Sequence, residues 1–524
     1  MSCPTRCFSA LLALHAAFAS AAEHHWLKRG GALTSNSYTS ATSASSIEEP
    51  PSWTWKNALD EQVRHTPLID VERNIYIQTA VRIRKFNPDG ALLWTWEVNR
   101  STDGRMNIAP VLHEEQILLA TSWPQCAHGA VQALSTLSGQ LVWRLPVTRC
   151  LTHDATSLFV ENNVLVFGTK DLGRQTSYDD EHGGTNVVVG MQLRSKEELW
   201  TYETDDVVWN FMPSSVGDGT IMFSTSCGGV HRINLHTGAL LWKAGRLGDI
   251  GGASRMCGCG GGVLGPNGKF YAEYNDDLAG QLPSTERAKV AAFEVSNGER
   301  LWERAFAARS FPPVTAAELS LSTVSAAMGE LGGWQYPAVG EIDGRTVVVA
   351  PVGSITGRPP WPEHWPIPDW LKAMGYVAQL HVSWFRRYVW FAPSLQNEVV
   401  ALDGDSGAVL WRYAMPIWDH WAPQSDEADV YQRSTRQAED PLVDVLCLPD
   451  NQGIPLITGD GTVYASDSHR GELFAIKDKN KDGVIEESEV QRFVTNKEFL
   501  NGPSLAPGLL VAAPCWGDAY VWKD

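Results

Sequence analysis

Short segments in which hydrophobic and polar residues alternate recur along most of the chain, and each predicts a β-strand. Many of these segments end in tryptophan and follow a tight turn, as in PDGALLWTW and HTGALLWKA. The tryptophans of this phrase are Trp94, Trp143, Trp200, Trp242, Trp302 and Trp411. SWTWKN, which contains Trp53 and Trp55, resembles the phrase without its turn. Together these copies predict seven equivalent outer strands.

Two further strands precede most copies of the phrase. VRIRKFN and GVHRINL are examples of the nearer strand, and NIYIQTA and NVLVFGT are examples of the one before it. Short strands, hairpin turns and a period of roughly 40–60 residues predict a β-propeller. A tryptophan at one fixed place would fill the wedge between neighbouring blades. The alternative is a β-sandwich with coincidental aromatic residues, and seven recurrences of the phrase favour the propeller.

The spacing of the phrase predicts eight four-stranded antiparallel blades, within a range of seven to nine. The eighth unit, GTVYASD followed by SHRGELFAIK, carries a charged loop where the turn and tryptophan should stand. The terminal strands PGLLVAAP and DAYVWKD lack an outer partner, and SWTWKN lacks inner ones. Pairing the two ends would close the ring and remove exposed edges. The gap between Trp302 and Trp411 could hold a ninth blade or a long insertion.

The repeat resembles the pyrroloquinoline quinone (PQQ)-type propeller repeat, most clearly in VALDGDSGAVLW and HRINLHTGALLW. The resemblance covers roughly residues 52–524 and implies the fold. Two groups share this repeat: the eight-bladed quinoprotein alcohol dehydrogenases and non-catalytic binding propellers, such as the bacterial outer-membrane assembly lipoprotein. The resemblance is specific for fold and does not choose between these activities.

The charged loop DKNKDGVIEESE, residues 478–489, meets every position of the EF-hand template D-x-[DN]-x-[DN]-G-x5-E. Gly483 permits the sharp turn, and Ile485 stands where an apolar anchor is expected. The predicted calcium ligands are Asp478, Asn480, Asp482, the Val484 carbonyl, Glu486 and Glu489. The alternative is a charged surface hairpin without a metal.

A sensing role does not follow from this loop. Sensor EF-hands come in pairs whose helices swing apart, whereas this chain has one loop entered by a strand at Leu473–Lys477. Only its exit, EESEVQRFVTNKEF, could be helical. We therefore expect calcium to act as a structural staple, effective even at modest affinity in the millimolar calcium outside cells.

The N-terminus has the pattern of a secretory signal. Arg6 precedes the apolar run FSALLALHAAFASAA, and Ala19-Ser20-Ala21 is a cleavage signal. The run is shorter than the roughly 20 residues that a transmembrane anchor needs. We expect residues 1–21 to be removed and the product to be secreted or lumenal. Residues 22–51, rich in Ser, Thr and Ala, are expected to form a flexible leader before the propeller at residues 52–524.

Composition narrows the range of partners. Hydrophobic residues make up 44% of the chain and charged residues 19%, as in a folded protein with a large core. The net charge of −18 disfavours nucleic acid and anionic membranes.

Seven cysteines follow the signal segment: Cys126, Cys150, Cys227, Cys257, Cys259, Cys447 and Cys515. An odd number leaves at least one unpaired, and Cys126 with Cys150 is one reasonable pair. Asn99-Arg100-Ser101 is an N-glycosylation sequon.

No catalytic residues can be assigned. The resemblance to quinoprotein dehydrogenases implies an axial PQQ, a calcium ion, an Asp base and often an adjacent Cys-Cys disulfide. The nearest match is Cys257-Gly258-Cys259, which could be a strained disulfide, the ends of two bridges, or a weak soft-metal site. His153-Asp154 and Asp205-Asp206 are candidates for acid–base work, although such residues at strand ends more often cap turns.

The segment at residues 357–391 is an insertion rich in Trp and Pro. Its Pro-rich half cannot be sheet interior, and DWLKAMGYVAQL could form a short helix capped by Asp369. Its aromatic residues, or a face of the ring, could bind a protein, a glycan or a small-molecule ligand, or the insertion could pack over the ring as a plug. The sequence thus predicts a secreted or lumenal calcium-binding propeller that acts as a binding or scaffolding module. The alternative is a PQQ-dependent alcohol dehydrogenase.

Overall fold

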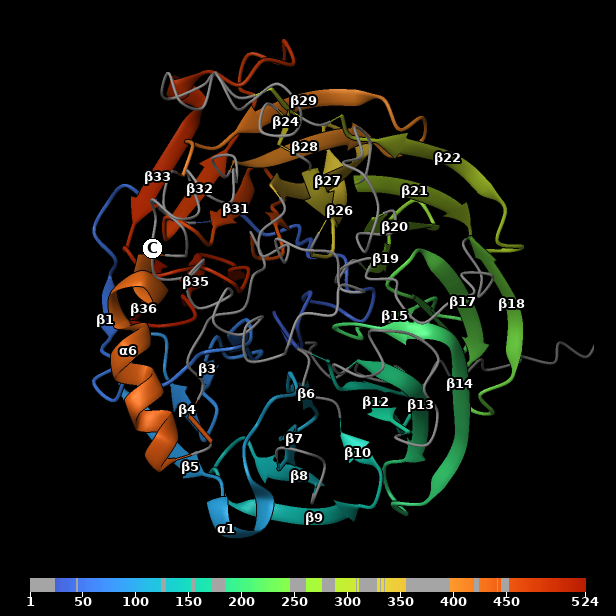
Figure 1. Ribbon diagram of the computed structural model, residues 1–524, viewed down its shortest axis with the longest axis vertical. Helices are drawn as coiled ribbons and strands as arrows, with labels where there is room; N and C mark the ends of the chain where they lie inside the picture. Colours follow the sequence, from blue (N-terminus) through green and yellow to red (C-terminus); the bar gives the residue numbers. More distant parts are fainter. Residues whose placement is uncertain are drawn as a thin grey trace, which may run out of the picture.

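The strands form eight antiparallel sheets around a central axis, like the blades of a propeller (Figure 1). The count of eight blades predicted from the tryptophan phrase is therefore confirmed. The computed structural model describes residues 24–43, 46–123, 129–151, 156–171, 184–245, 261–275, 288–307, 309–310, 328–329, 331–333, 335–354, 396–418, 424–440, 442–443 and 452–524.

The first four blades follow one another in chain order. Blade 1 consists of β2 (Leu68–Ile69), β3 (Ile75–Gln78), β4 (Arg82–Phe86) and β5 (Leu92–Glu97). Blade 2 consists of β6 (Val111–His113), β7 (Gln116–Ser122), β8 (Gly129–Ser135) and β9 (Leu141–Val147). Blade 3 consists of β10 (Cys150–Leu151), β11 (Phe159–Glu161), β12 (Val164–Lys170), β13 (Thr185–Gln192) and β14 (Glu198–Val208). Blade 4 consists of β15 (Ser214–Ser215), β16 (Thr220–Ser224), β17 (Gly229–Asn234) and β18 (Leu240–Gly245).

The second half of the ring repeats this order. Blade 5 consists of β19 (Gly262–Leu264), β20 (Lys269–Asn275), β21 (Ala288–Glu294) and β22 (Arg300–Ala305). Blade 6 consists of β25 (Leu331–Gly333), β26 (Ala338–Ile342), β27 (Arg345–Ser354), β28 (Asn397–Asp403) and β29 (Val409–Ala414). Blade 7 consists of β30 (Leu456–Ile457), β31 (Val463–Asp467), β32 (Glu472–Ile476) and β33 (Val490–Val494). Strands β23 (Arg309–Ser310) and β24 (Met328–Gly329) pair separately, within the long gap of the repeat.

Blade 8 joins the two ends of the described chain. It consists of β34 (Ser504–Ala506), β35 (Leu509–Ala512), β36 (Ala519–Lys523) and β1 (Trp53–Trp55). Strand β1 runs antiparallel to β36, with Trp53 opposite Val521 and Trp55 opposite Ala519. The predicted closure of the ring is confirmed, because the outer strand of this blade comes from the opposite end of the sequence.

Each regular joint between blades is made by the tryptophan of the phrase and the turn of the next blade. The indole N–H of Trp302, for example, donates to the Gly404 carbonyl at 3.0 Å. A Cβ atom added to Gly407, in the same turn, would come within 2.6 Å of the Trp302 ring. The same indole-to-carbonyl bond is made by Trp53, Trp94, Trp200 and Trp242. Tryptophan therefore recurs because its ring covers a bare glycine while its N–H satisfies a turn carbonyl.

The glycines of these turns also need their own backbone conformation. Gly407 has φ +68° and Gly298 has φ +77°, in the left-handed region that other residues rarely adopt. A one-residue bulge follows at the start of the outer strand, for example at Leu410, since Ala401 pairs with Trp411 and Leu402 pairs with Val409. Turn, bulge and tryptophan thus form one structural unit that the phrase encodes.

The segment predicted to be a flexible leader instead lies along the inner strands of the ring, so that expectation was wrong for residues 24–43. Its backbone N–H and C=O groups pair with residues of blades 1, 2, 4, 5, 6 and 7. The residues that it meets there are Ile69, Leu112, Ser215, Leu264, Val339, Ile457 and Gly459. The segment needs no apolar periodicity because main-chain hydrogen bonds hold it, and its composition therefore resembled that of a disordered stretch.

Lys28 is the most deeply buried charged residue of this segment, with 0% of its surface exposed. Its Nζ atom donates to the Ser35 hydroxyl and lies 5.9 Å from the centre of the Phe159 ring. Burial, with a smaller contribution from Arg29, lowers the pKa of Lys28 to about 7. The segment is therefore part of the core and not an appendage.

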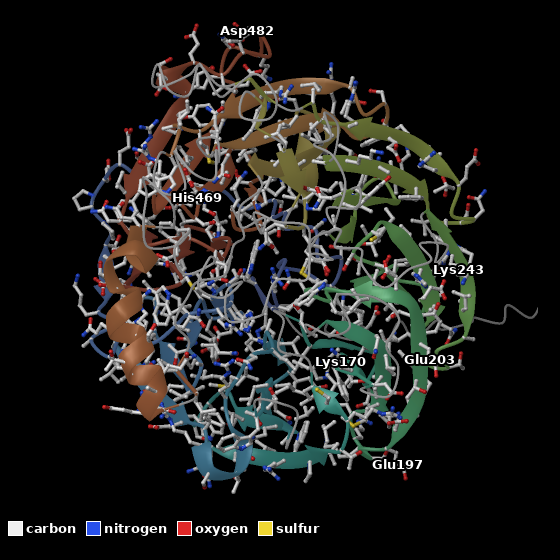
Figure 2. The ribbon with its side chains drawn as sticks, in the orientation of Figure 1. Lys170, Glu197, Glu203, Lys243, His469 and Asp482 are labelled. Atoms are coloured by element: carbon white, nitrogen blue, oxygen red, sulfur yellow. The ribbon has the colours of Figure 1, made fainter. Side chains whose placement is uncertain are left out.

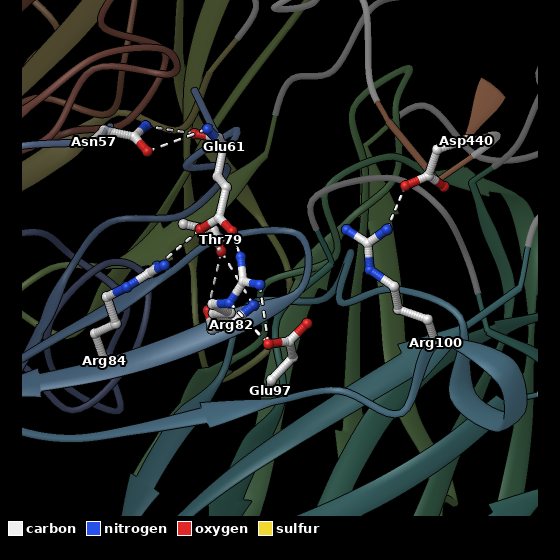
Figure 3. A network of polar contacts seen from close by, with 8 residues as sticks. All are labelled: Asn57, Glu61, Thr79, Arg82, Arg84, Glu97, Arg100 and Asp440. Atoms are coloured by element: carbon white, nitrogen blue, oxygen red, sulfur yellow. Dashed lines mark hydrogen bonds and ion pairs between the residues drawn. The ribbon is translucent and has the colours of Figure 1, made fainter. Parts of the chain in front are cut away.

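Two segments of the described chain are α-helical: α1 (Arg100–Asp103) and α6 (Gln424–Glu439). Helix α6 runs beside blades 8 and 1 (Figure 1). It is held mainly by charge: Arg433 stacks on Trp516 at 3.9 Å, and Lys497 bonds Asp429 at 2.8 Å. Figure 3 shows two ion-pair systems at this side, Arg100 with Asp440 and Glu61 with Arg82 and Arg84.

Candidate metal centre and the ring axis

The EF-hand-like loop connects β32 to β33 in blade 7, at the place where other blades have the turn and the tryptophan phrase. Asp482 lies at the outer end of this blade, away from the axis (Figure 2). The exit of the loop is not helical beyond one short 3-10 turn at Glu487–Glu489, because β33 begins directly at Val490. Only that one turn of the possible exit helix is present, and a strand follows it.

The carboxylates of the loop accept hydrogen bonds from the backbone of the loop. Asp478 accepts from the N–H groups of Asp482 at 3.2 Å and Gly483 at 3.0 Å. Glu489 accepts from Lys479 at 2.6 Å, Asn480 at 3.3 Å and Glu486 at 3.1 Å. These N–H groups, that of Glu486 first, lower the pKa of Glu489 below its ordinary value. Glu489 thus stays ionised and ties the two ends of the loop together.

The donor chemistry of the loop fits calcium. Asp478, Asp482 and Glu489 offer hard carboxylate oxygens, and Gly483 has φ +79°, as the sharp turn requires. In the described residues, no three or more His, Cys, Asp or Glu side chains form a group that could hold a metal ion. The predicted set also uses the Asn480 amide and the Val484 carbonyl, and an ion would have to draw the carboxylates closer together. Calcium at this loop therefore stays a prediction.

The loop packs against the outer strand of blade 6. A Cβ atom added to Gly483 would lie 2.8 Å from the Leu410 carbonyl oxygen. Ile485 and Leu410 pack against the buried cluster that contains Trp411. Lys481 pairs with Asp343 of blade 6 at 2.7 Å, with both side chains more than half exposed. At a regular joint, the tryptophan of one blade packs on the glycine turn of the next blade. The loop therefore stands where blade 7 would have that turn.

Two arginines stand on segments that border the inner strands: Arg29 on residues 24–43 and Arg64 just before β2. Arg29 donates to Gln335 at 2.9 Å and lies over the Tyr336 ring at 5.9 Å. Arg64 donates to Asn107 at 3.4 Å. A quinone site of the expected kind would also need a calcium ion and an Asp base. Among the described residues, no group of three or more His, Cys, Asp or Glu side chains could hold a metal ion, so no ligand set for PQQ and calcium is assigned.

The other residues singled out in the sequence have simpler roles or lie outside the described part. Asp205 pairs with Lys243, and Asp206 accepts from the Val207 N–H at 2.8 Å. His153-Asp154, Cys126, Cys257, Cys259, Cys447 and the insertion at 357–391 all lie outside the described residues. Cys150, Cys227 and Cys515 are disulfide-bonded. The pairing of Cys126 with Cys150 stays a prediction.

Sequence reasoning did not identify Leu410, Trp411 and Asp343 as the surface that receives the loop. One signal was present, since Trp411 is the one copy of the phrase followed in the next repeat by the charged loop instead of a turn. A joint between two blades depends on residues far apart in sequence, and this contact becomes clear only in three dimensions.

Comparisons with known proteins agree with the fold. The sequence family described as outer membrane protein assembly factor BamB matches residues 48–244. No curated protein matches the chain. The structure is similar to quinohemoprotein alcohol dehydrogenase ADHIIG from Pseudomonas putida HK5, with TM-score 0.59, 12% identity, and 95% of this chain and 80% of that chain covered.

Two further solved structures show the same architecture. Quinohemoprotein alcohol dehydrogenase from Comamonas testosteroni has TM-score 0.56 and 11% identity, covering 95% of this chain and 80% of that one. BamB from Moraxella catarrhalis has TM-score 0.50 and 12% identity, covering 90% of this chain and 100% of that one. The protein is thus an eight-bladed β-propeller, and its residues 48–244 match a family of PQQ-type repeats. At such low identity the likeness shows the fold alone.

Proposed function

We propose that the protein is a secreted or lumenal, calcium-stabilised propeller that acts as a binding or scaffolding module for another protein. The observation that carries this proposal is an exposed apolar rim on the outer strands of blades 1 to 6. The match of residues 48–244 to the BamB family supports a protein partner. None of the described helices is long and apolar enough to cross a bilayer.

The apolar rim consists of aliphatic side chains that precede the tryptophan in each copy of the phrase. Their exposed fractions lie between 40% and 55%. They are Leu92, Leu93, Leu141, Val142, Leu199, Leu240, Leu241, Leu301 and Val409. Scattered single exposed residues need no explanation, whereas a repeated set on a soluble chain is typical of an interaction surface.

The strands of the apolar rim are also edge strands. Within the described residues β5, β9, β14, β18, β22 and β29 each pair on one side only. An edge strand offers unpaired N–H and C=O groups to an extended segment of another chain. We therefore propose that the partner adds a strand along one outer edge and places its own apolar side chains against the rim.

Calcium has a structural part in this proposal. The loop at residues 478–489 replaces the glycine turn at the joint between blades 6 and 7, so the ion would stiffen the joint that lacks the regular contact. Binding of an ion to the folded state alone stabilises by about 2.7 kcal/mol when its concentration is 100 times the Kd. Calcium in the extracellular fluid would keep the ring in one shape for its partner.

The partner proposal is tested by capture from the native extracellular milieu. We expect paired rim substitutions, Leu92→Ser with Leu93→Ser or Leu240→Ser with Leu241→Ser, to lose proteins that the unmodified chain retains. Leu137→Ser is the matched control, since Leu137 is 86% exposed and lies outside the rim. Equal capture by the rim variants and the control would rule out the apolar rim as the binding surface.

The calcium proposal is tested by thermal unfolding with and without calcium. The double substitution Asp478→Ala, Glu489→Ala should abolish the calcium-dependent rise in Tm of the unmodified protein. Glu487→Gln is the control, because this side chain is 85% exposed and stands at no ligand position of the template. A Tm that ignores calcium in the unmodified protein would refute the staple.

The competing prediction, a PQQ-dependent alcohol dehydrogenase, is tested on the same preparation. Dye-linked alcohol oxidation after adding PQQ and calcium would favour the enzyme over the scaffold. Quinone absorbance that stays with the protein through gel filtration would point the same way. We expect neither, because no ligand set for PQQ and calcium can be assigned among the described residues.

A further inference from the structure

The sequon Asn99-Arg100-Ser101 lies on the outer side of blade 1. It begins two residues after β5, the outer strand of that blade, and continues into the single turn of α1. All three of its residues are exposed. It is the one Asn-x-Ser/Thr sequence of the whole chain, so the protein offers a single acceptor of this kind.

The side-chain amide of Asn99 is oriented by the third residue of the sequon. Its Oδ1 atom accepts hydrogen bonds from the Ser101 backbone N–H at 3.2 Å and from the Ser101 hydroxyl at 2.7 Å. Within the described chain, this side chain uses only Oδ1 for its hydrogen bonds. The amide nitrogen Nδ2 is the atom to which a sugar would be joined, and a sugar there would break no hydrogen bond of the fold.

The surroundings of the sequon are polar and well fixed. Asp103, the last residue of α1, is buried and accepts hydrogen bonds from Gln132 at 3.2 Å and from Arg144 Nε at 2.9 Å, both in blade 2. Arg100 reaches across to Asp440, directly after α6 (Figure 3). The chain around the acceptor is therefore held by charged and polar contacts, and a hydrated sugar suits such a surface.

We propose that Asn99 carries an N-linked oligosaccharide. The proposal rests on the secretory route of the proposed function, because the sugar donor, an oligosaccharide joined to a lipid pyrophosphate, is found along that route. The transfer forms a bond between Asn99 Nδ2 and carbon 1 of the first sugar. It breaks the bond from that carbon to the pyrophosphate oxygen, the lipid pyrophosphate leaves, and Nδ2 gives up one proton to a base of the transferase.

This position leaves the apolar rim accessible. The rim residues Leu92 and Leu93 stand at the start of β5, whereas Asn99 follows its end. Six residues separate Leu93 from Asn99, which is about 20 Å of extended chain. A partner strand could pair with the first part of β5 but would meet the sugar beyond Glu97. The oligosaccharide thus sets a limit at one end of this edge and spares its apolar side chains.

The modification is tested by secreting the full chain from cultured eukaryotic cells and measuring its mass before and after treatment with a peptide N-glycosidase. The enzyme should remove the mass of one oligosaccharide. Asn99→Asp should secrete a chain without sugar and with an unchanged Tm, because aspartate can still cap α1. Ser101→Ala should also lose the sugar, while Ser101→Thr should keep it. Thr102→Ala, an exposed neighbour outside the sequon, is the matched control and should keep it.

Two leaders separate this proposal from the secretion on which it rests. One preparation keeps residues 1–21, and the other replaces them with the signal peptide of a known secreted protein. A chain that is secreted and glycosylated only with the foreign leader would refute secretion by its own leader and keep Asn99 as the acceptor. A chain that is secreted without sugar, or an Asn99→Asp variant that still carries one, would overturn the proposal.

The position of the sugar relative to the rim has its own test. The glycosylated chain and Asn99→Asp should capture the same proteins from the extracellular milieu, because the sugar stands away from Leu92 and Leu93. Capture that appears only in Asn99→Asp would show that the oligosaccharide covers the rim, and would overturn this placement.

Discussion

Two neighbouring joints of the ring solve the same packing problem with different parts. Between blades 5 and 6, the Trp302 ring covers Gly407 and its N–H bonds the Gly404 carbonyl. Between blades 6 and 7, Trp411 belongs to the buried cluster against which Ile485 of the EF-hand-like loop packs. The first joint is complete within the protein, and we propose that the second depends on an ion. One repeat unit can thus replace its glycine turn with a loop whose stability we propose to depend on calcium, without changing the fold.

Removing each tryptophan should give the largest effect. Trp302→Ala and Trp411→Ala should each lower the free energy of unfolding by about 3–5 kcal/mol, from lost packing and the cavity left behind. Only Trp411→Ala should also reduce the stabilisation that calcium adds, because the loop then loses the surface beneath it. Urea unfolding with and without calcium measures both. Equal calcium increments in the two variants would show that the loop does not act through Trp411.

Substituting the glycine of each joint should give an intermediate effect. Gly407→Ala and Gly483→Ala combine left-handed backbone strain with a close contact, to the Trp302 ring and the Leu410 carbonyl respectively. We expect losses of about 2–4 kcal/mol. Gly344→Ala is the matched control, since its φ is +73° and nothing lies within 4 Å of the added Cβ. If Gly344→Ala lowered the free energy of unfolding as much as the joint variants do, the whole loss would come from backbone strain.

A smaller, pH-dependent effect should come from Glu273 in the regular joint. This carboxyl is buried against Gly333 of blade 6, and neither of its oxygens has a hydrogen-bond partner among the described residues. Burial raises the pKa of Glu273 well above its ordinary value of 4.5. The folded state therefore holds a proton that the unfolded chain releases above that value, and stability falls as pH rises from there towards the raised pKa.

Glu273→Gln should remove this loss. The variant should match the unmodified protein near pH 4 and exceed its free energy of unfolding near pH 8, by about 1.4 kcal/mol for each unit of pKa shift. Chemical denaturation at the two pH values measures the difference. A constant difference at both would mean that Glu273 does not titrate differently in the folded state.

The exposed ion pair across the second joint should matter least. Lys481 and Asp343 are 65% and 57% exposed, so solvent screens their attraction. Lys481→Ala should change the free energy of unfolding by about 0–0.5 kcal/mol, and less at high salt. Thermal unfolding at low and high ionic strength checks this. A larger loss, confined to calcium-loaded protein, would show that the pair supports the occupied loop.

The regular parts of the ring could be predicted from sequence because each rests on a local rule. A glycine with positive φ, a bulge and a tryptophan stand within one short phrase, as at Gly407 and Trp411. The closure by β1 and β36 followed from strands left without partners. The loop at residues 478–489 could also be placed in its repeat from the sequence, whereas calcium binding by this loop is a proposal.

What could not be predicted depends on contacts that carry no local pattern. Residues 24–43 read as a flexible leader, yet their main chain pairs with six blades and Lys28 is fully buried. Backbone hydrogen bonds leave no periodicity in the side chains. Helix α6 was likewise missed, since charges such as Arg433 and Asp429 hold it in place of an apolar stripe.

The pairing of β1 with β36 has a consequence for biosynthesis. Ser52 and Lys523, which bond beside this pair, are 471 residues apart. At translation rates of about 5–20 residues per second, the first strand would be made on the order of a minute before its partner exists. During that time the growing chain would be an open arc with an uncovered sheet at each end. Chaperones that shield nascent strands would therefore have their greatest effect before the last twenty or so residues are made.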